Sequence, residues 1–164
     1  MLFETERLYV RQFTEADLDN LYLLSSDPVV MQYIRAPISL EACRDLLNEL
    51  IEGYKTHPYS GRFAIIEKSR QQYAGNFLLR YSSFMGGTET GYALLQHAWG
   101  RGYATELTKA GLQFAFKYLQ QEMVYAITDP LNAASQKVLL KCGFVQRHNF
   151  LENGKEVCLF EVKQ

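Results

Sequence analysis

The chain has 164 residues, of which 48% are hydrophobic and 21% are charged, and its formal net charge is -1 at pH 7. This length suffices for one domain with a sizeable core, so we expect a single domain over residues 1–164. The small net charge excludes the broad basic surface that sequence-independent binding of nucleic acid requires. No apolar run approaches the ~20 residues of a membrane-spanning helix, and the acidic start MLFETERLYVRQF is unlike a signal peptide. We therefore expect a cytoplasmic protein with neither nucleic-acid nor membrane partners.

The first part of the chain is expected to form a strand, a helix, a loop and a second helix. Leu8 and Val10 alternate with polar neighbours as in a strand, and helical spacing begins after Thr14, a favourable N-cap. The segment SSDPVVMQYIRAPIS is predicted to be a loop with a short helical turn, because Pro28 and Pro37 interrupt it. LEACRDLLNELIEGY then has leucines at helical spacing. The loop and this second helix are candidates for a movable wall over a substrate cleft.

The remaining elements predict a mixed sheet. RFAIIEK, QYAGNFLLRYSSF and TETGYALL are three β-rich runs typical of an antiparallel meander. From Gly102 to Tyr118 apolar residues fall on one helical face, where Gly111 suits close approach to a sheet. MVYAIT is predicted as a strand, and NAASQKVLLKCGF as a short helix with Asn132 at its N-cap and Gly143 at its end. FVQRHNF and KEVCLFEV, joined across ENGK, complete an α/β or α+β chain with a hairpin.

A glycine-containing turn in LLQHAWGRGYATEL joins the third of those runs to the long helix. Such a turn leaves backbone N–H groups unpaired at the positive end of the helix dipole. Gly100 and Gly102 permit φ angles that a side chain disfavours and let an anion approach the amides, while Arg101 adds charge and Thr105 a hydroxyl. The pattern predicts a phosphate site. It is GxGxxT rather than the dinucleotide fingerprint GxGxxG, and a tight strand-to-helix turn alone would also explain the glycines.

Three segments of the chain resemble a known family. GYALLQHAWGRGYATEL and NAASQKVLLKCGF resemble the two acetyl-CoA motifs of the GNAT N-acetyltransferases, and ETERLYVRQFTEADLDNLYLLSSDPVVMQYI resembles the opening of the RimJ/RimL type. The likeness covers essentially the whole chain, in the right order and at the right separations. It implies a GNAT-like acyl-CoA N-acyltransferase fold, with a central, mostly antiparallel sheet of about seven strands flanked by about four helices.

The resemblance also implies where acetyl-CoA, the co-substrate, binds. In the family the strand equivalent to TETGYALL is bulged and splays from MVYAIT, so backbone groups near Leu94 and Leu95 would pair with the pantetheine arm. Asn132 would bond the pantetheine or acetyl region in addition to capping its helix, and Lys137 would meet the 3′-phosphate unless it is simply solvated. The diphosphate would lie on the amides of Gly100, Arg101, Gly102, Tyr103, Ala104 and Thr105.

Two residues are expected to take part in catalysis by an enzyme of this type. The resemblance to the RimJ/RimL type, which has a Ser at this position, makes Ser135 the candidate donor to the departing CoA sulfur; the Tyr that many relatives have at the position of Leu139 is absent. Glu89 is the candidate base, acting through water because an extended strand puts it roughly 16 Å from Leu94. Their simpler roles are a serine at a helix start and a solvated carboxylate. The expected reaction is direct attack by a primary amine in a ternary complex.

The acceptor is expected to be either a protein N-terminal α-amine or a small-molecule amine, chosen by SDPVVMQYIRAP, the following helix and the final hairpin. A non-catalytic sensor that binds acetyl-CoA is the alternative, motivated by the missing Tyr. A dinucleotide-binding fold is disfavoured, because three consecutive β runs precede the glycine turn. No metal site is expected, since His57, His97 and His148 are dispersed. The protein is expected to be a monomer or a homodimer.

Overall fold

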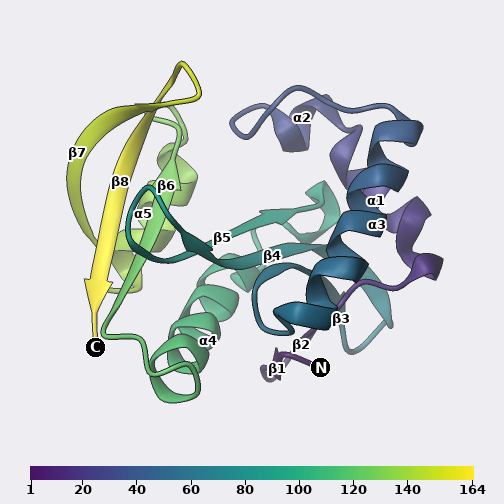
Figure 1. Cartoon of the computed structure of the whole chain (residues 1–164), viewed down its shortest axis with the longest axis horizontal. Coiled ribbons are helices and arrows are strands. Elements are labelled where there is room, and N and C mark those ends of the chain that lie inside the picture. Colours follow the sequence, from purple (N-terminus) through teal and green to yellow (C-terminus); the bar gives the residue numbers. More distant parts are fainter.

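The computed structural model describes residues 1–164 and contains one eight-stranded sheet with the order β1-β2-β3-β4-β5-β6-β8-β7 (Figure 1). The strands are β1 (Phe3–Glu4), β2 (Leu8–Arg11), β3 (Gly61–Glu67), β4 (Gln72–Ser82), β5 (Gly87–Leu94), β6 (Met123–Thr128), β7 (Val145–Glu152) and β8 (Lys155–Lys163). The helices are α1 (Leu18–Ser25), α2 (Pro28–Met31), α3 (Leu40–Thr56), α4 (Tyr103–Lys117) and α5 (Ala133–Lys141). Only β5 and β6 pair in parallel, so the predicted mixed and mostly antiparallel sheet is confirmed.

Two short elements raise the number of strands and helices above the expected seven and four. β1 pairs with β2 through only two residues, too few for a recognisable alternation in the sequence. The helical turn expected after Asp27 is the four-residue helix α2, whose first amides, those of Val29 and Val30, donate to the Asp27 carboxylate. Both elements are therefore held by local pairing rather than by an apolar repeat.

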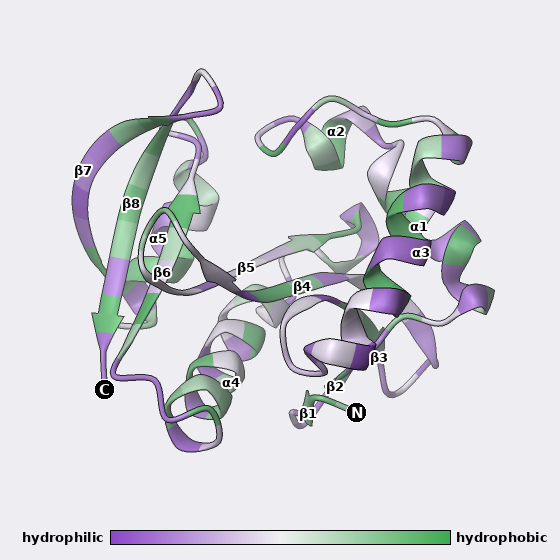
Figure 2. Ribbon diagram, viewed as in Figure 1, coloured by the Kyte–Doolittle hydropathy of each residue, from purple (hydrophilic) through white to green (hydrophobic).

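Helix α4 and the helices α1 and α3 lie on opposite sides of the central strands (Figure 1). α4 packs closely because Gly111 has no side chain, and a Cβ there would overlap the ring of Phe77 on β4. This confirms the role predicted for Gly111. Figure 2 shows apolar residues along the central strands, whereas the edge strand β7 is largely hydrophilic and exposed.

Strands β5 and β6 are neighbours over only two residues and then diverge. Thr88 and Glu89 pair with β6, and no later residue of β5 does. The bulge expected in β5 is wrong, because β5 pairs with β4 without a register shift as far as Leu94. The shift lies instead between β3 and β4, where Ala74 is the extra residue. β5 and β6 part because each follows the twist of its own antiparallel partner, β4 for one and β8 for the other.

The C-terminal hairpin forms as predicted. Glu152 of β7 pairs with Lys155 of β8, and the two residues between them, Asn153 and Gly154, have φ of 50° and 79°. Positive φ at both positions is the requirement of a type I′ turn, which Asn-Gly meets well.

None of the helices has the length and apolar character needed to cross a membrane.

Candidate functional site

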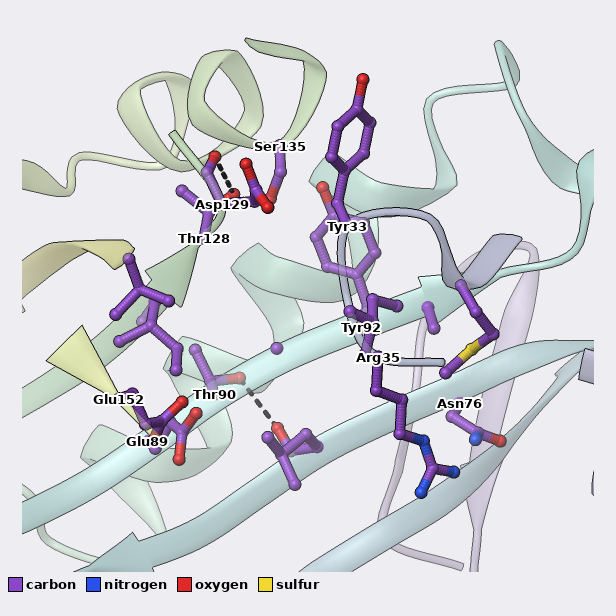
Figure 3. A pocket seen from close by; sticks show the side chains of 18 of the residues that line it. Tyr33, Arg35, Asn76, Glu89, Thr90, Tyr92, Thr128, Asp129, Ser135 and Glu152 are labelled. Atoms are coloured by element: carbon purple, nitrogen blue, oxygen red, sulfur yellow. Dashed lines mark hydrogen bonds between the residues drawn. The ribbon is translucent and has the colours of Figure 1, made fainter. Parts of the chain in front are cut away.

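A cavity of about 480 Å³ lies where β5 and β6 diverge (Figure 3). Its floor is formed by β3, β4 and β5, and one wall by the end of β6 and the start of α5. The opposite wall comes from α1, α2 and the segment after α2, and the β7–β8 turn completes the lining. Elements from both halves of the sequence therefore meet around one space, and the fold positions them there through the splayed sheet.

A side chain from the hairpin connects the two walls. The ammonium group of Lys155 donates to the carbonyl of Tyr33 at 3.0 Å and lies 2.9 Å from a carboxylate oxygen of Asp129. The pKa of Asp129 is lowered by this hydrogen bond from Lys155. Tyr33 belongs to the segment after α2, and Asp129 follows β6. Lys155 thus connects the two walls of the cavity.

The alternating hydrogen bonds between β5 and β4 determine which backbone groups of β5 are free where β5 and β6 diverge. The Leu95 amide donates to the carbonyl of Ala74 on the β4 side at 2.9 Å. In an antiparallel pair every second residue bonds the neighbour, so the backbone groups of Tyr92 and Leu94 face away from β4, toward the gap left by β6. One of them is already engaged, because the indole N–H of Trp99 donates to the Leu94 carbonyl at 2.7 Å.

This alternation corrects the expectation that the backbone of Leu95 pairs with the pantetheine arm, because the Leu95 amide already donates to Ala74 within the sheet. Tyr92 takes its place as the second strand residue with a free backbone at the splay. The sequence alone does not reveal which residues of β5 bond β4, because a register shift of one residue would exchange the residues that bond β4 with those that are free.

The turn from Gly100 to Thr105 presents a run of amides without partners. None of the N–H groups of these six residues donates a hydrogen bond within the chain, and the first amide of α4 that does so is that of Glu106, to the Gly102 carbonyl. Gly100 has φ of 70° and Gly102, the N-cap of α4, has φ of 78°. A Cβ on Gly100 would meet nothing within 4 Å, so conformation rather than space favours glycine there. The φ angles predicted from the glycines are confirmed.

Ion pairs of two arginines hold this turn in place. The Arg101 guanidinium donates to both carboxylate oxygens of Glu67, at 2.7 and 2.9 Å, and Glu67 is only 1% exposed. These hydrogen bonds, with a further one from Ser69, lower the pKa of Glu67 to about 2. Arg7 donates to the Arg101 carbonyl at 2.9 Å and also pairs with Glu106. The positive charge that Arg101 was expected to add beside an anion is therefore balanced by a buried carboxylate, while its amide remains available.

The start of α5 forms as predicted and brings a hydroxyl to the cavity. The Asn132 side chain accepts the Ser135 amide at 3.1 Å, which confirms Asn132 as the N-cap. Ser135 lines the cavity together with Tyr92. Burial raises the pKa of the Tyr92 phenol, and the nearby Ser135 hydroxyl partly offsets the effect. Asn132 and the exposed Lys137 do not line the cavity.

Glu89 lies on the cavity floor rather than in solvent. It is 3% exposed, and one carboxylate oxygen is 2.9 Å from Nε of Arg80, the residue directly opposite on β4. The simpler role of a solvated carboxylate is therefore wrong. Glu89 and Ser135, predicted separately from a strand and a helix, line the same cavity. Figure 3 shows both among its lining side chains.

Comparisons with known proteins agree with this architecture. A family model described as an acetyltransferase (GNAT) domain matches residues 7–145. The uncharacterized N-acetyltransferase p20 of Bacillus licheniformis is 29% identical over 143 residues, which cover 85% of this chain and 80% of that protein.

Solved structures share the fold over nearly their whole length. An acetyltransferase of the GNAT family from Bacillus anthracis matches with a TM-score of 0.85 at 22% identity, covering 98% of this chain and 96% of that one. The spermidine N-acetyltransferase of Vibrio cholerae, solved with CoA and spermine, matches with a TM-score of 0.75 at 21% identity, covering 96% of each chain.

Proposed function

The chain belongs to the GNAT acetyltransferase family, and we propose that it transfers an acetyl group to a primary amine by direct attack in a ternary complex. Membership makes it an acyltransferase with acetyl-CoA as co-substrate and confirms the family resemblance seen in the sequence. The RimJ/RimL-like subgroup and a cytoplasmic location form part of the proposal on the sequence grounds given above. The observation that carries it is the splayed β5–β6 cleft ending at the unpaired amides of Gly100 to Thr105.

The groups of the cleft fit the chemistry of CoA. The free backbone of Tyr92 is suited to pair with the amides of the pantetheine arm, as a neighbouring strand would, and the Leu94 amide is left for the acetyl end of the co-substrate. The amides of Gly100 to Thr105, at the positive end of α4, would hold the diphosphate through charge-assisted hydrogen bonds. The side-chain NH₂ of Asn132 would reach the pantetheine, since capping uses only its oxygen, and the exposed Lys137 would meet the 3′-phosphate. Acetyl-CoA supplies the activated acetyl group.

The groups around the cavity have different roles in the proposed reaction. Glu89 accepts the proton of the attacking amine through water, and Arg80 fixes the position of the carboxylate. The Leu94 amide, directed into the splay, stabilises negative charge on the acetyl oxygen, a contribution of about 3 kcal/mol for one such donor. Ser135 donates a hydrogen bond to the departing sulfur. Tyr92, which lines the same cavity, helps to orient the hydroxyl.

A thiol-release assay tests the proposal. Acetyl-CoA is incubated with the protein and with N-terminal peptides, polyamines, aminoglycosides or amino acids, and free CoA thiol is measured with and without each amine. We expect release that depends on one class of amine and is reduced by Ser135→Ala. Tight CoA binding without release for any amine would instead identify a sensor. Absence of both binding and release would contradict the whole proposal.

A further inference from the structure

The floor of the cavity carries more positive charge than the reaction requires. In the strand register Arg62 on β3 lies opposite Leu78, which lies opposite Gly91 on β5, so all three side-chain positions share one face of the sheet. Arg80 and Glu89, two residues further along, lie on that same face. Arg35 enters from the segment after α2 and extends across these strands in Figure 3. Three guanidinium groups therefore share the floor with one carboxylate.

Two of these guanidinium groups have no counterion. Arg80 is matched by Glu89, but neither Arg35 nor Arg62 takes part in any ion pair of the chain. Nε of Arg35 is buried and has no hydrogen-bond partner. Burial and repulsion from Arg35 and Arg80 lower the pKa of Arg62. Unpaired charge in a partly buried site is costly, which indicates a missing anionic partner.

The other arginines of the chain show that this arrangement is not a general feature of its surface. Five of them pair with carboxylates, and the remaining two, Arg44 and Arg70, are exposed to solvent. Only Arg35 and Arg62 combine partial burial with the lack of a partner, and both line the cavity.

A carboxylate lies across the cavity from Arg35. Glu152, near the end of β7, lines the cavity and makes no ion pair, because the charge of the neighbouring Lys155 is matched by Asp129. Figure 3 shows Arg35 and Glu152 on opposite sides of the space. The cavity therefore has a cationic side and an anionic side, and Gly91, which has no side chain, forms part of its floor. Such a polarity suits a molecule with a positive group at one end and a negative group at the other.

We propose that the acceptor is a small amine that also bears a carboxylate, of about the size of an amino acid, and that Arg62 and Arg35 bind this carboxylate. This inference rests on the proposed function. Arginine binds carboxylates in a bidentate manner, and Arg62 lies two strand spacings, roughly 10 Å, from Gly91 at the splay. The bridge made by Lys155 and the cavity volume of about 480 Å³, shared with the acetyl end of the co-substrate, favour a small acceptor. A polyamine would meet like charge at Arg35 and Arg62.

Matched acceptors test the inference by kinetics. Amino acids are compared with their α-amides, which keep the amine and the side chain and lose only the carboxylate charge. We expect at least one amino acid to be used with kcat/KM at least about tenfold above that of its amide, mostly through KM. Arg62→Gln and Arg35→Gln should each lower kcat/KM for that amino acid by about tenfold or more and change the value for its amide less than about threefold. Arg44→Gln, on the exposed face of α3, is the matched control and should behave as the wild type.

A binding measurement separates failure of this inference from failure of the proposed function. Calorimetric titration with N-acetyl amino acids and with their amides needs no turnover. Binding of the carboxylates alone, lost in Arg62→Gln with an unchanged melting temperature and CoA affinity, supports the inference even if no amine is acetylated. Equal use or binding of acids and amides, a preference for polyamines or for long N-terminal peptides, or no binding of either compound would overturn it. An enzyme that acetylates only uncharged or polycationic amines would keep the proposed function and lose this inference.

Discussion

The substitution Gly100→Ala tests whether the turn before α4 binds the diphosphate through its backbone. Gly100 has φ of 70°, and a Cβ there would meet nothing in the protein within 4 Å. Any effect on ligand binding must therefore come from the backbone conformation or from contact with the ligand itself. Gly86, in the β4–β5 turn, has φ of 65° and equally open surroundings. Gly86→Ala thus imposes the same strain outside the site and serves as the matched control.

The expected magnitude follows from the conformational cost of the left-handed region. An alanine there costs about 1–2 kcal/mol relative to glycine, and where the turn relaxes in the free protein this cost falls on ligand binding instead of on stability. In the free Gly100→Ala protein the turn can relax, and CoA binding must then restore the strained conformation. A cost of about 1–2 kcal/mol corresponds to a Kd for CoA that is roughly 5- to 30-fold higher. Gly86→Ala should bind CoA as the wild type does.

Isothermal titration calorimetry with CoA and with pantetheine provides the measurement. Pantetheine lacks the diphosphate, so its affinity should be the same in both variants and in the wild type. Urea denaturation measures the loss of stability in each variant, which is small where the free turn relaxes and at most about 1–2 kcal/mol where the turn keeps its conformation. If Gly100→Ala and Gly86→Ala bind CoA equally well, the backbone of this turn does not hold the diphosphate.

Three further substitutions address the chemistry and the support of the turn. Glu89→Gln should lower kcat by less than the ~10²–10⁴ of a direct base, because a water relays the proton, and should alter the acid limb of the pH–rate profile; a profile that coincides with that of the wild type argues against the role. Ser135→Ala should lower kcat with little change in KM, and an unchanged turnover number removes Ser135 from the mechanism. Glu67 has a folded-state pKa of about 2 against an ordinary value near 4.5, so its ion pair stabilises the fold fully above pH ~4.5 and progressively less as the pH falls toward 2. Glu67→Gln should therefore be less stable than the wild type at pH 7, by a margin that shrinks between pH 4.5 and 2 in urea denaturation, and a margin independent of pH contradicts this reasoning.

The sequence predicts those parts of the fold that depend on local periodicity and capping. The order of the main elements, the Asn-Gly hairpin and the N-cap at Asn132 follow from neighbouring residues, and the structure contains all three. The positive φ of Gly100 and Gly102 follows in the same way, because a strand that turns directly into a helix needs residues with that freedom.

Features that depend on pairing across long sequence separations were not predictable from the chain. Whether Leu95 or Tyr92 has a free backbone depends on the strand register. The hydrophobic pattern of a strand buried on both faces does not determine that register. Arg101 finds its partner Glu67 on β3, 34 positions away, so its neutralisation is visible only in the fold. The Arg80–Glu89 pair is the exception, because both residues flank one turn and lie at opposing positions of a hairpin.

The arginines of the cavity floor were missed for a related reason. Arg62 stands at the beginning of RFAIIEK and Arg35 in a loop, and neither position is unusual by itself. Their proximity arises only when α2 and its following segment lie over the sheet. Arg62 is the second residue of β3 and Glu67 is its last, so charge near the end of this strand gave no signal specific to Arg62.

The most direct test of the proposed binding mode is an amide NMR titration of the ¹⁵N-labelled protein with CoA and, separately, with pantetheine. The amides of Gly100 to Thr105 have no acceptor within the chain, so bonding to a diphosphate should shift their resonances strongly. We predict large shifts at these residues with CoA and small ones with pantetheine, while Tyr92 responds to both. Resonances of Gly100 to Thr105 that stay in place at saturating CoA would contradict the account.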